Sequence, residues 1–304
     1  MTEANAPALY RRLFERPIFI VSTPRSGSSL LFETLANAPN LFTVGGESHG
    51  VIERIPSFSL VSREWSSNRL TADDAQTDPV EQLARSFYEK LRDRDGRPAF
   101  GRVRMLEKTP KNALRVPFFD SVWPDAMFVY LYRDVRQTLA SMIEAWLSGR
   151  FRTYPRLPGW DGLPWSLLLV PGWRSLIGKP LPQIVAEQWA ITTGALIQDL
   201  ESIPIERLRI VIYGELVGSP QMVMHSLARS LGLGWDRPLQ SKLPLSRHTV
   251  SLPEAEKWRT IEDVIKATLP IVEEADGMAR AFIERFTTRC SQATAKGHEG
   301  RAPK

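Results

Sequence analysis

The sequence predicts an α/β fold in which helices cover both faces of a parallel sheet of about five strands. Short apolar runs predict strands at residues 18–22, 102–106, 127–132 and 208–213, with residues 41–44 as a weaker fifth. Helical periodicity lies between these runs, and strands joined by helical crossovers run parallel. Because 43% of the 304 residues are hydrophobic, the chain can bury a large core, and its single cysteine excludes an intrachain disulfide.

Apolar residues that recur with the helical period of about 3.6 residues predict the helices that separate the strands. They cover residues 29–37, 79–92, 135–147, 181–201, 219–231, 253–266 and 271–285. We therefore expect one domain over residues 1–304, with its core at 17–286. The first dozen residues and a flexible tail at 288–304 are expected to lack structure.

Residues 148–182 form an irregular insertion with three tryptophans, six prolines and little periodicity. A segment of this length without regular elements is typical of a lid over a binding site. The alternative is a structural excursion that packs on its own aromatic side chains. The sequence leaves both interpretations open.

The charge of the chain favours an anionic partner. Lysine and arginine total 39 against 34 acidic residues, for a net charge of +5, and the basic residues are dispersed. This pattern predicts a basic pocket for a small anion rather than a nucleic-acid surface. No apolar run is long enough to span a bilayer or to serve as a signal peptide, so the protein is expected to be cytoplasmic.

The first motif is the loop between the first strand and the first helix, Thr23-Pro-Arg-Ser-Gly-Ser-Ser29. Backbone N–H groups at the start of a helix stabilise a phosphate-like anion, and Gly27 lets the backbone approach it closely. Arg25 adds a permanent charge. A P-loop NTPase instead requires Gly-x4-Gly-Lys-Ser/Thr, and here Ser22 and Ser28 occupy the first glycine and the lysine positions.

The second motif follows the strand at 127–132. Asp134 and Gln137 predict a capping box that opens the next helix, which leaves Arg133 on the loop and Ser141 two turns into the helix. Arginine suits a phosphate because its planar fork donates two hydrogen bonds. The alternatives are a salt bridge from Arg133 to Asp134, or a phosphotransferase in which Asp134 binds magnesium.

Together these motifs resemble the sulfotransferases that use 3′-phosphoadenosine 5′-phosphosulfate (PAPS). Residues 23–29 are similar to their 5′-phosphosulfate loop, and Arg133 and Ser141 match the spacing of the pair that holds the 3′-phosphate. Residues 107–117, 123–130, 213–217 and 245–251, with Lys257-Trp258, look like the bacterial members and their tyrosylprotein relatives. The resemblance implies a P-loop-like three-layer sandwich. It also implies the following donor-binding residues: Arg25, Ser26, Gly27, Ser28, Ser29, Arg133, Ser141, Tyr213 against the adenosine, and Ser251 and Lys257 closing over the nucleotide.

Sulfuryl transfer needs a base for the acceptor and a cation for the leaving group. The cytosolic small-molecule enzymes take their base from Lys-Thr-His, but this chain has Lys108-Thr-Pro110. Its Gly45-Gly-Glu-Ser48 is similar to the Gly-Gly-Glu-Thr of tyrosylprotein enzymes, which implies Glu47 as base, with His49 as the alternative. Lys108, assisted by Arg25, is expected to stabilise the leaving group, and no metal is expected. Lys111 is interpreted as a surface charge.

These features predict a transferase that moves a sulfuryl group from PAPS to a hydroxyl or amine of a small molecule, sugar or lipid. Its partners would be PAPS, which is released as adenosine 3′,5′-bisphosphate (PAP), and an unidentified acceptor. Two alternatives remain at this stage. One is a P-loop phosphotransferase, and the other is a non-catalytic module that binds nucleotides or polyanions.

Overall fold

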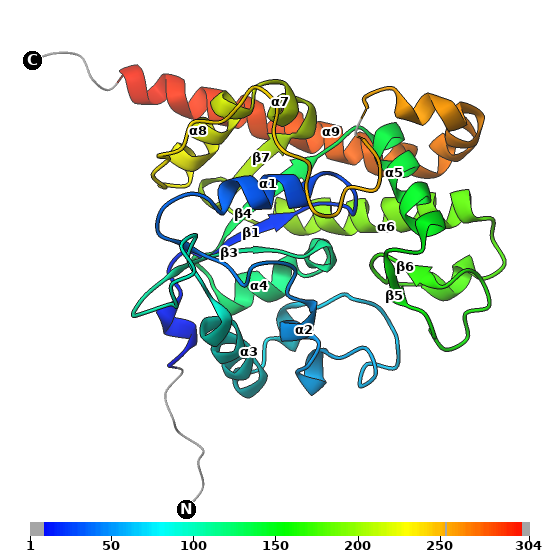
Figure 1. Ribbon diagram of the computed structural model, residues 1–304, viewed down its shortest axis with the longest axis horizontal. Helices are drawn as coiled ribbons and strands as arrows, with labels where there is room; N and C mark the ends of the chain where they lie inside the picture. The colour runs from blue at the N-terminus through cyan, green and yellow to red at the C-terminus, as the bar shows by residue number, and fades with distance from the viewer. Residues whose placement is uncertain (1–8, 253, 300–304) are drawn as a thin grey trace, which may run out of the picture.

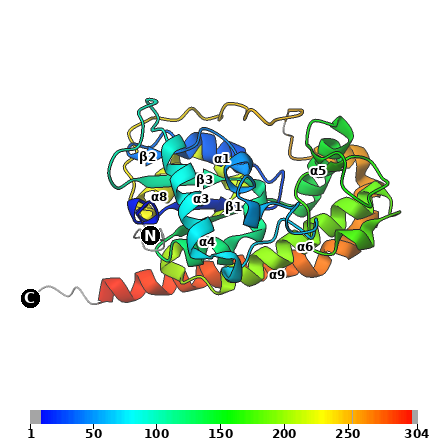
Figure 2. The same ribbon diagram turned by 90° about the horizontal axis from the view of Figure 1, so that it is seen from below.

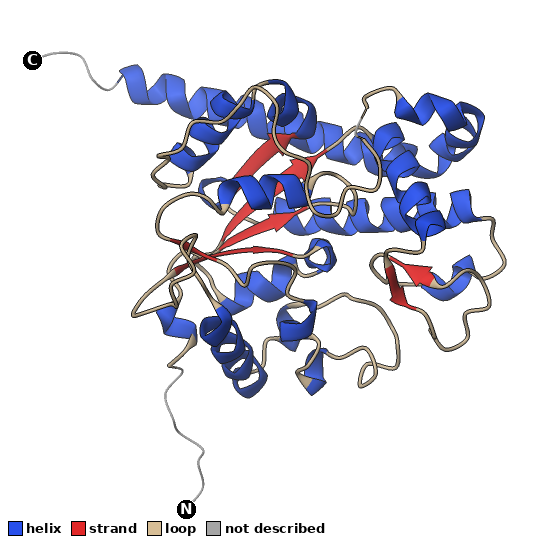
Figure 3. Ribbon diagram, viewed as in Figure 1, coloured by secondary structure: helices blue, strands red, loops and turns tan. Residues whose placement is uncertain are grey.

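The computed structural model describes residues 9–252 and 254–299, and a five-stranded parallel sheet lies at its centre (Figure 3). The strand order is β2-β3-β1-β4-β7. The strands are β1 (Ile18–Val21), β2 (Leu41–Phe42), β3 (Arg104–Lys108), β4 (Met127–Tyr132) and β7 (Leu208–Ile212). The predicted fold class and parallel sheet are confirmed.

Helices cover both faces of the sheet, so the molecule has three layers (Figure 1). Ile18 and Ile20 of β1 point to the face covered by α1 (Ser28–Leu35), α7 (Tyr213–Gly218) and α8 (Pro220–Ser230). Phe19 and Val21 point to the face covered by α3 (Thr77–Lys90), α4 (Val116–Val122), α6 (Leu181–Glu201) and α9 (Glu262–Glu299). Burial on both faces explains why the strands read as apolar runs rather than as alternating patterns.

The connections of β1 and β4 diverge, although the two strands are neighbours. β1 leads through α1 to β2 at one edge of the sheet, whereas β4 leads towards β7 at the other. In open α/β sheets such a divergence leaves a crevice at the carboxyl ends of the strands, where ligands bind. The loops after Val21 and Tyr132, which carry the two predicted anion motifs, flank this point.

A second core lies beside the sheet, where the insertion packs against α5 (Val135–Ser148) and α6. The insertion contains a short antiparallel pair, β5 (Arg152–Tyr154) and β6 (Trp165–Ser166), and the 3-10 turn η5 (Trp173–Leu176). Trp165 and Trp173 are fully buried, and their rings meet edge to face at 5.8 Å. The aromatic side chains of the insertion thus pack on one another and on these helices, and its role as a lid stays a prediction.

The carboxyl-terminal helices differ from the prediction. Residues 253–266 and 271–285 do not form two helices. Instead η7 (Lys257–Ile261) leads into α9, which runs through Pro270. Ile265, Val272 and Ala279 keep one buried stripe on both sides of the proline, and this tertiary packing offsets the lost backbone hydrogen bond.

Both ends of the described chain are more ordered than the sequence indicated. The prediction of an unstructured tail is wrong as far as Glu299, because α9 continues to that residue, and extending an existing helix costs little. Arg11–Leu13 form the 3-10 turn η1, and Phe14 is buried. Residues 1–8 and 300–304, also expected to lack structure, lie outside the described residues.

The sequence pattern did not predict several short elements. They are α2 (His49–Ile52), α4, α7, η2 (Pro56–Phe58), η3 (Ala72–Asp74), η4 (Pro110–Leu114) and η6 (Ile205–Arg207). Such short helices carry little periodicity, so the pattern cannot find them. Within the described ranges, no helix is long and apolar enough to cross a membrane.

Candidate functional site

A cavity of about 790 Å³ lies at the carboxyl ends of β1 and β4, where the topology predicts a ligand site. Most of the residues singled out from the sequence line this one cavity, although they come from distant parts of the chain. They are Arg25, Gly27, Ser28, Ser29, Glu47, Arg133, Ser141, Tyr213, Ser251 and Lys257. Ser26 and Lys108 do not line it.

The loop before α1 presents backbone N–H groups to the cavity. α1 begins at Ser28, and its N-cap, Gly27, offers no side-chain acceptor to the first turn. Gly27 has φ +98°, and a Cβ atom there would lie 2.5 Å from the Tyr213 ring, so only glycine fits. The exposed N–H groups and the helix dipole favour an anion at this point.

The Ser26 side chain does not serve the cavity. Its hydroxyl is buried and lies 2.7 Å from the Thr23 hydroxyl, across the turn. The tight turn therefore directs this hydroxyl inward. The place of Ser26 among the donor-binding residues, which the resemblance implied, stays a prediction.

Arg25 and Arg133 lie together in the lining of the cavity. Arg133 Nη1 donates to the Arg25 carbonyl at 3.1 Å, and its guanidinium lies 4.4 Å from the centre of the Tyr213 ring. Arg25 Nε donates to Ser141 Oγ at 3.3 Å. Burial lowers the pKa of both guanidinium groups. Within the described chain neither arginine forms an ion pair, so both charges are available to an anionic ligand.

Asp134 does not pair with Arg133, which removes the salt-bridge interpretation. Its carboxylate accepts hydrogen bonds from the N–H groups of Arg136 and Gln137 and forms an ion pair with Arg136 at 3.0 Å. The predicted N-cap is thus correct, but Gln137 does not complete a capping box. Its side chain instead accepts a hydrogen bond from Arg133 Nε at 3.2 Å. Asp134 is not part of the cavity lining.

Glu47 and Lys108 form an ion pair beside the start of α1. Lys108 Nζ lies 2.6 Å from Glu47 Oε1 and 2.9 Å from Ser29 Oγ, and its side chain is buried. Glu47 Oε2 lies 2.6 Å from His49 Nε2. Burial alone would raise the pKa of Glu47, but the hydrogen bond with His49 and the charge of Lys108 lower it to about 2. Glu47 is therefore a carboxylate in the free protein.

A buried polar network fixes the loop that carries Glu47. The neighbouring Ser48 donates its N–H to Thr109 Oγ1 at 2.7 Å and its hydroxyl to Glu107. Glu107 also accepts from Thr109 Oγ1 at 2.7 Å and from the Asn112 side chain. Burial raises the pKa of Glu107 despite these hydrogen bonds. This network joins the loop after β2 to the end of β3.

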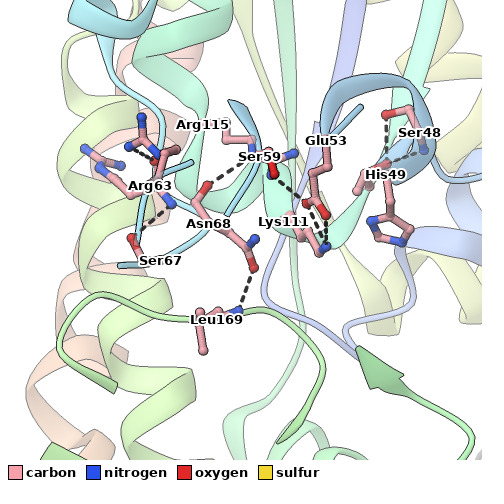
Figure 4. Close-up of polar contacts among 12 residues, drawn as sticks. Ser48, His49, Glu53, Ser59, Arg63, Ser67, Asn68, Lys111, Arg115 and Leu169 are labelled. Atoms are coloured by element: carbon pink, nitrogen blue, oxygen red, sulfur yellow. Dashed lines mark hydrogen bonds and ion pairs between the residues drawn. The ribbon is translucent and has the colours of Figure 1, made fainter. Parts of the chain in front are cut away.

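Lys111 is not a surface charge, contrary to the sequence interpretation. Its side chain is 4% exposed, it lines the cavity, and its Nζ lies 2.7 and 2.9 Å from the two oxygens of Glu53 (Figure 4). Arg115 Nη2 contacts the same carboxylate at 3.0 Å. The signal in the sequence was Arg115, a charged residue between apolar Leu114 and Val116, which indicates a buried ionic cluster.

The segment between α8 and η7 passes over α1 (Figures 1 and 2), and most of its residues from 242 to 252 line the cavity. We call residues 242–252 the covering segment. The His248 carbonyl accepts from Arg25 at 2.9 Å, and Arg247 binds Glu33 at 2.8 Å and the Gly45 carbonyl at 2.8 Å. At its end, Ser251 contacts Lys257. Ser251 and Lys257 both line the cavity, and their closing over a nucleotide stays a prediction.

Comparison with known proteins agrees with these motifs. Residues 17–161 match the model of the sulfotransferase family. This stretch contains both anion motifs, Glu47 and Lys108, so the match rests on the residues that build most of the cavity.

Individual relatives are distant. A putative protein-tyrosine sulfotransferase of Caenorhabditis briggsae is 28% identical over 131 residues, which cover 43% of this chain and 44% of that protein. Protein-tyrosine sulfotransferase A of Caenorhabditis elegans is 23% identical over 253 residues, which cover 82% of this chain and 58% of that protein. This chain thus spans about half the length of these relatives.

The solved structure of a sulfotransferase from Alicyclobacillus acidocaldarius aligns with a TM-score of 0.46 at 14% identity, over 86% of this chain and 95% of that one. The family match covers the two anion motifs that carried the expectation. The resemblance of this chain to the sulfotransferase family is thereby confirmed.

Proposed function

We propose that this protein transfers a sulfuryl group from PAPS to a hydroxyl or amine of a small molecule, sugar or lipid. One observation carries the proposal. Two half-buried arginines with no carboxylate partner among the described residues, Arg25 and Arg133, face one cavity from the ends of neighbouring strands. Cations that are partly removed from water and lack a counter-ion favour an anionic ligand, and two of them suit a nucleotide with phosphates at both its 5′ and 3′ positions.

The residues divide naturally between the two ends of such a nucleotide. Arg25, Ser28 and Ser29, with the N-terminus of α1, would hold the 5′-phosphosulfate. Arg133 and Ser141 would hold the 3′-phosphate, and Tyr213, whose ring already lies against Arg133, would contact the adenosine. The covering segment, with Ser251 and Lys257, would close over the bound nucleotide.

Glu47 is proposed as the general base. In the reaction the acceptor oxygen or nitrogen bonds to sulfur, the bond from sulfur to the bridging phosphate oxygen breaks, and the acceptor's proton moves to Glu47. Lys108 and Arg25 would neutralise the negative charge that grows on the leaving phosphate. No metal enters this scheme.

The ion pair between Glu47 and Lys108 links donor binding to the strength of the base. A carboxylate with a pKa of about 2 accepts a proton poorly. If Lys108 turns its hydrogen bond from Glu47 to the donor, the carboxylate loses the neighbouring charge and its pKa rises. Donor binding would thus activate the base only when there is a sulfuryl group to transfer.

The insertion would supply the acceptor side of the cavity. Its residues 150–153, 167 and 168 are part of the lining, so the packed aromatic segment also forms a wall. We propose that this wall acts as a lid over the acceptor. The single cysteine fits a reaction in the cytoplasm, where thiols stay reduced.

The test is ligand-dependent stability. PAP should raise the melting temperature more than 5′-AMP or ATP at equal concentration, because only PAP engages both arginines. Equal stabilisation by PAP and 5′-AMP would remove the case for a 3′-phosphate site, and magnesium-dependent stabilisation by ATP would favour a phosphotransferase. Incubation with labelled PAPS and a fractionated metabolite extract would then identify the acceptor.

A further inference from the structure

Lys111, Glu53 and Arg115 form a buried ionic cluster at the edge of the cavity (Figure 4). Two cations share one carboxylate in this cluster. The side chains of Lys111 and Arg115 are 4% and 1% exposed, and that of Glu53 is 21% exposed. The cluster therefore holds one surplus positive charge in a place that water hardly reaches.

No second carboxylate pairs with the cluster among the described residues, because Glu47, the next one that faces Lys111, is itself paired with Lys108. Arg115 uses Nε for the Asn68 carbonyl at 3.1 Å and Nη2 for Glu53, and its buried Nη1 has no hydrogen-bond partner within the described residues. Lys111 Nζ lies 4.9 Å from the centre of the Tyr154 ring. An uncompensated buried charge is costly, so an arrangement that keeps one indicates a ligand that supplies the missing anion.

Lys111 is the member of the cluster that can meet such a ligand, because it lines the cavity. It follows Lys108 by three residues and lies against β5 of the insertion through Tyr154. Most groups assigned to the donor come instead from the loops after β1 and β4, from α1, α5 and α7, and from the covering segment and η7. Lys108, at the end of β3, would lie between the donor and Glu47. Lys111 thus lies on the side of Glu47 and the insertion, where the acceptor must approach the base.

We propose that Lys111 binds an anionic group on the acceptor, such as a carboxylate, sulfate or phosphate, and so selects acidic acceptors. This inference rests on the proposed function, because it assigns the acceptor side of the same cavity. Glu53 keeps its present ion pairs with Lys111 and Arg115 when the anion binds.

A purely structural role explains Lys111 poorly. Arg115 alone already gives Glu53 a counter-charge at 3.0 Å. Replacing Lys111 by methionine leaves that pair intact and removes the surplus charge. We therefore expect Lys111→Met to fold with a melting temperature at or above that of the wild type.

The charge of Lys111 also predicts how anion binding depends on pH. The groups that face it are Glu53, Arg115, Tyr154 and, further away, Glu47. Burial lowers its pKa to about 8, with Glu53 opposing this and Arg115 adding to it. As the pH rises through 8, Lys111 loses its proton and the cluster becomes neutral, so anion binding should weaken between pH 7 and pH 9.

The experiment measures the melting temperature with saturating PAP, which occupies the donor site and tests the proposed function separately. Sodium sulfate is then added, with sodium chloride at the same ionic strength as reference. Sulfate suits this purpose because it does not titrate between pH 7 and pH 9. The variants are Lys111→Met and, as a matched control, Lys179→Met, which removes a lysine paired with Glu187 at 3.1 Å outside the cavity.

In the wild type at pH 7, we expect sulfate to add roughly 2–4 °C to the PAP-bound melting temperature. The increment should disappear in Lys111→Met, persist in Lys179→Met and shrink at pH 9. An increment that survives in Lys111→Met would place the anion elsewhere, for example near Lys108, and overturn the inference. No increment over chloride in the wild type would overturn it too, while the PAP effect still upheld the donor site. Without any PAP effect the proposed function fails, and this inference with it.

Discussion

The part of the cavity at Arg25 and Arg133, here called the donor end after its proposed ligand, holds two half-buried arginines with no carboxylate partner among the described residues. Beside Glu47 and the insertion, at the proposed acceptor end, Lys108 and Lys111 each lie against a carboxylate. The donor end is therefore prepared for a ligand with several negative charges, which it binds without breaking any ion pair. At the acceptor end the proposed scheme rearranges the ion pair of Lys108 with Glu47 when the donor arrives, while Lys111 keeps its ion pair with Glu53. This difference suggests that the arginines mainly determine affinity for the nucleotide, while the lysine–glutamate pairs control the chemistry.

The largest expected effect tests the acceptor end. Glu47→Gln keeps the shape of the side chain and an oxygen for Lys108, but it removes the base. We expect kcat to fall about 10²–10⁴-fold, which is the usual contribution of a general base, while the affinity for PAP hardly changes. Steady-state kinetics with labelled PAPS and a PAP titration measure the two quantities.

His49→Ala is the control for this assignment. His49 lies 2.6 Å from Glu47 through Nε2, and its buried Nδ1 has no partner within the described chain. We expect a smaller loss of kcat in this variant, because it removes only one of the two groups that hold Glu47. A large loss in His49→Ala together with near-normal kcat in Glu47→Gln would mean that histidine is the base.

The next effect tests the donor end. Arg133→Ala removes a charged donor for the 3′-phosphate, so the affinity for PAP should fall about 10–100-fold, as expected for one or two charge-assisted hydrogen bonds. The affinity for 5′-AMP, which lacks that phosphate, should fall much less. Calorimetric titration with both nucleotides measures this difference.

Arg136→Ala provides the matched control for Arg133. Arg136 lies three residues along the chain, is 45% exposed and pairs with Asp134 rather than with the cavity. Its loss should leave both nucleotide affinities within about twofold. A similar loss of PAP affinity in the two variants would show that general positive charge, not a specific phosphate contact, governs the donor end.

The sequence predicted the fold well where elements are long and apolar. The observed bounds of β4 and α6 are those expected, because their apolar patterns are unambiguous. β3 begins and ends two residues later than predicted, since Glu107 and Lys108 are polar yet buried. Their burial depends on partners from other elements, and a pattern in one segment cannot show these.

The same limit applies to the site. The loops at the strand ends, with Arg25, Glu47 and Arg133, could be located because parallel strands bring their carboxyl ends together. The partners that these residues contact could not be located from the sequence. Lys111 was assigned to the surface because its counter-ion, Glu53, and the facing Tyr154 come from distant segments.

The Glu107 network offers a smaller, structural test of the acceptor end. Asn112 Oδ1 is buried without a partner within the described residues, next to the Glu107 carboxyl. In Glu107→Gln, the new amide can donate to this oxygen once the Asn112 amide turns over, while the glutamine oxygen still accepts from Ser48 and Thr109. We therefore expect Glu107→Gln to fold normally and to retain the loop of Glu47. Glu107→Ala leaves these partners unpaired and should lose about 2–4 kcal/mol of stability.

The pH dependence of the Glu107 variants follows from the raised pKa. Burial raises the pKa of Glu107 above the ordinary 4.5. As the pH rises, the carboxyl group therefore loses its proton at a lower pH in the unfolded chain than in the folded protein. The stability of the wild type then falls as the pH rises above 4.5, until the folded-state pKa is passed. The Glu107→Gln variant has no carboxyl group at this position, so its stability does not fall for this reason. Urea unfolding should show the variant gaining stability relative to the wild type between pH 4.5 and pH 7, and a constant difference would contradict a raised pKa.

The smallest expected effect is that of chelation, which should leave turnover unchanged. In the proposed reaction, the side-chain cations of Arg25 and Lys108 neutralise the leaving phosphate, as a metal ion does in phosphotransferases. Initial rates with labelled PAPS should therefore agree within error with and without EDTA, and added magnesium should not raise them. A rate that EDTA abolishes and magnesium restores would show that these cations are insufficient. The unpaired arginines would then have to be reinterpreted as ligands of a metal–nucleotide complex, and the phosphotransferase alternative would take the place of sulfuryl transfer.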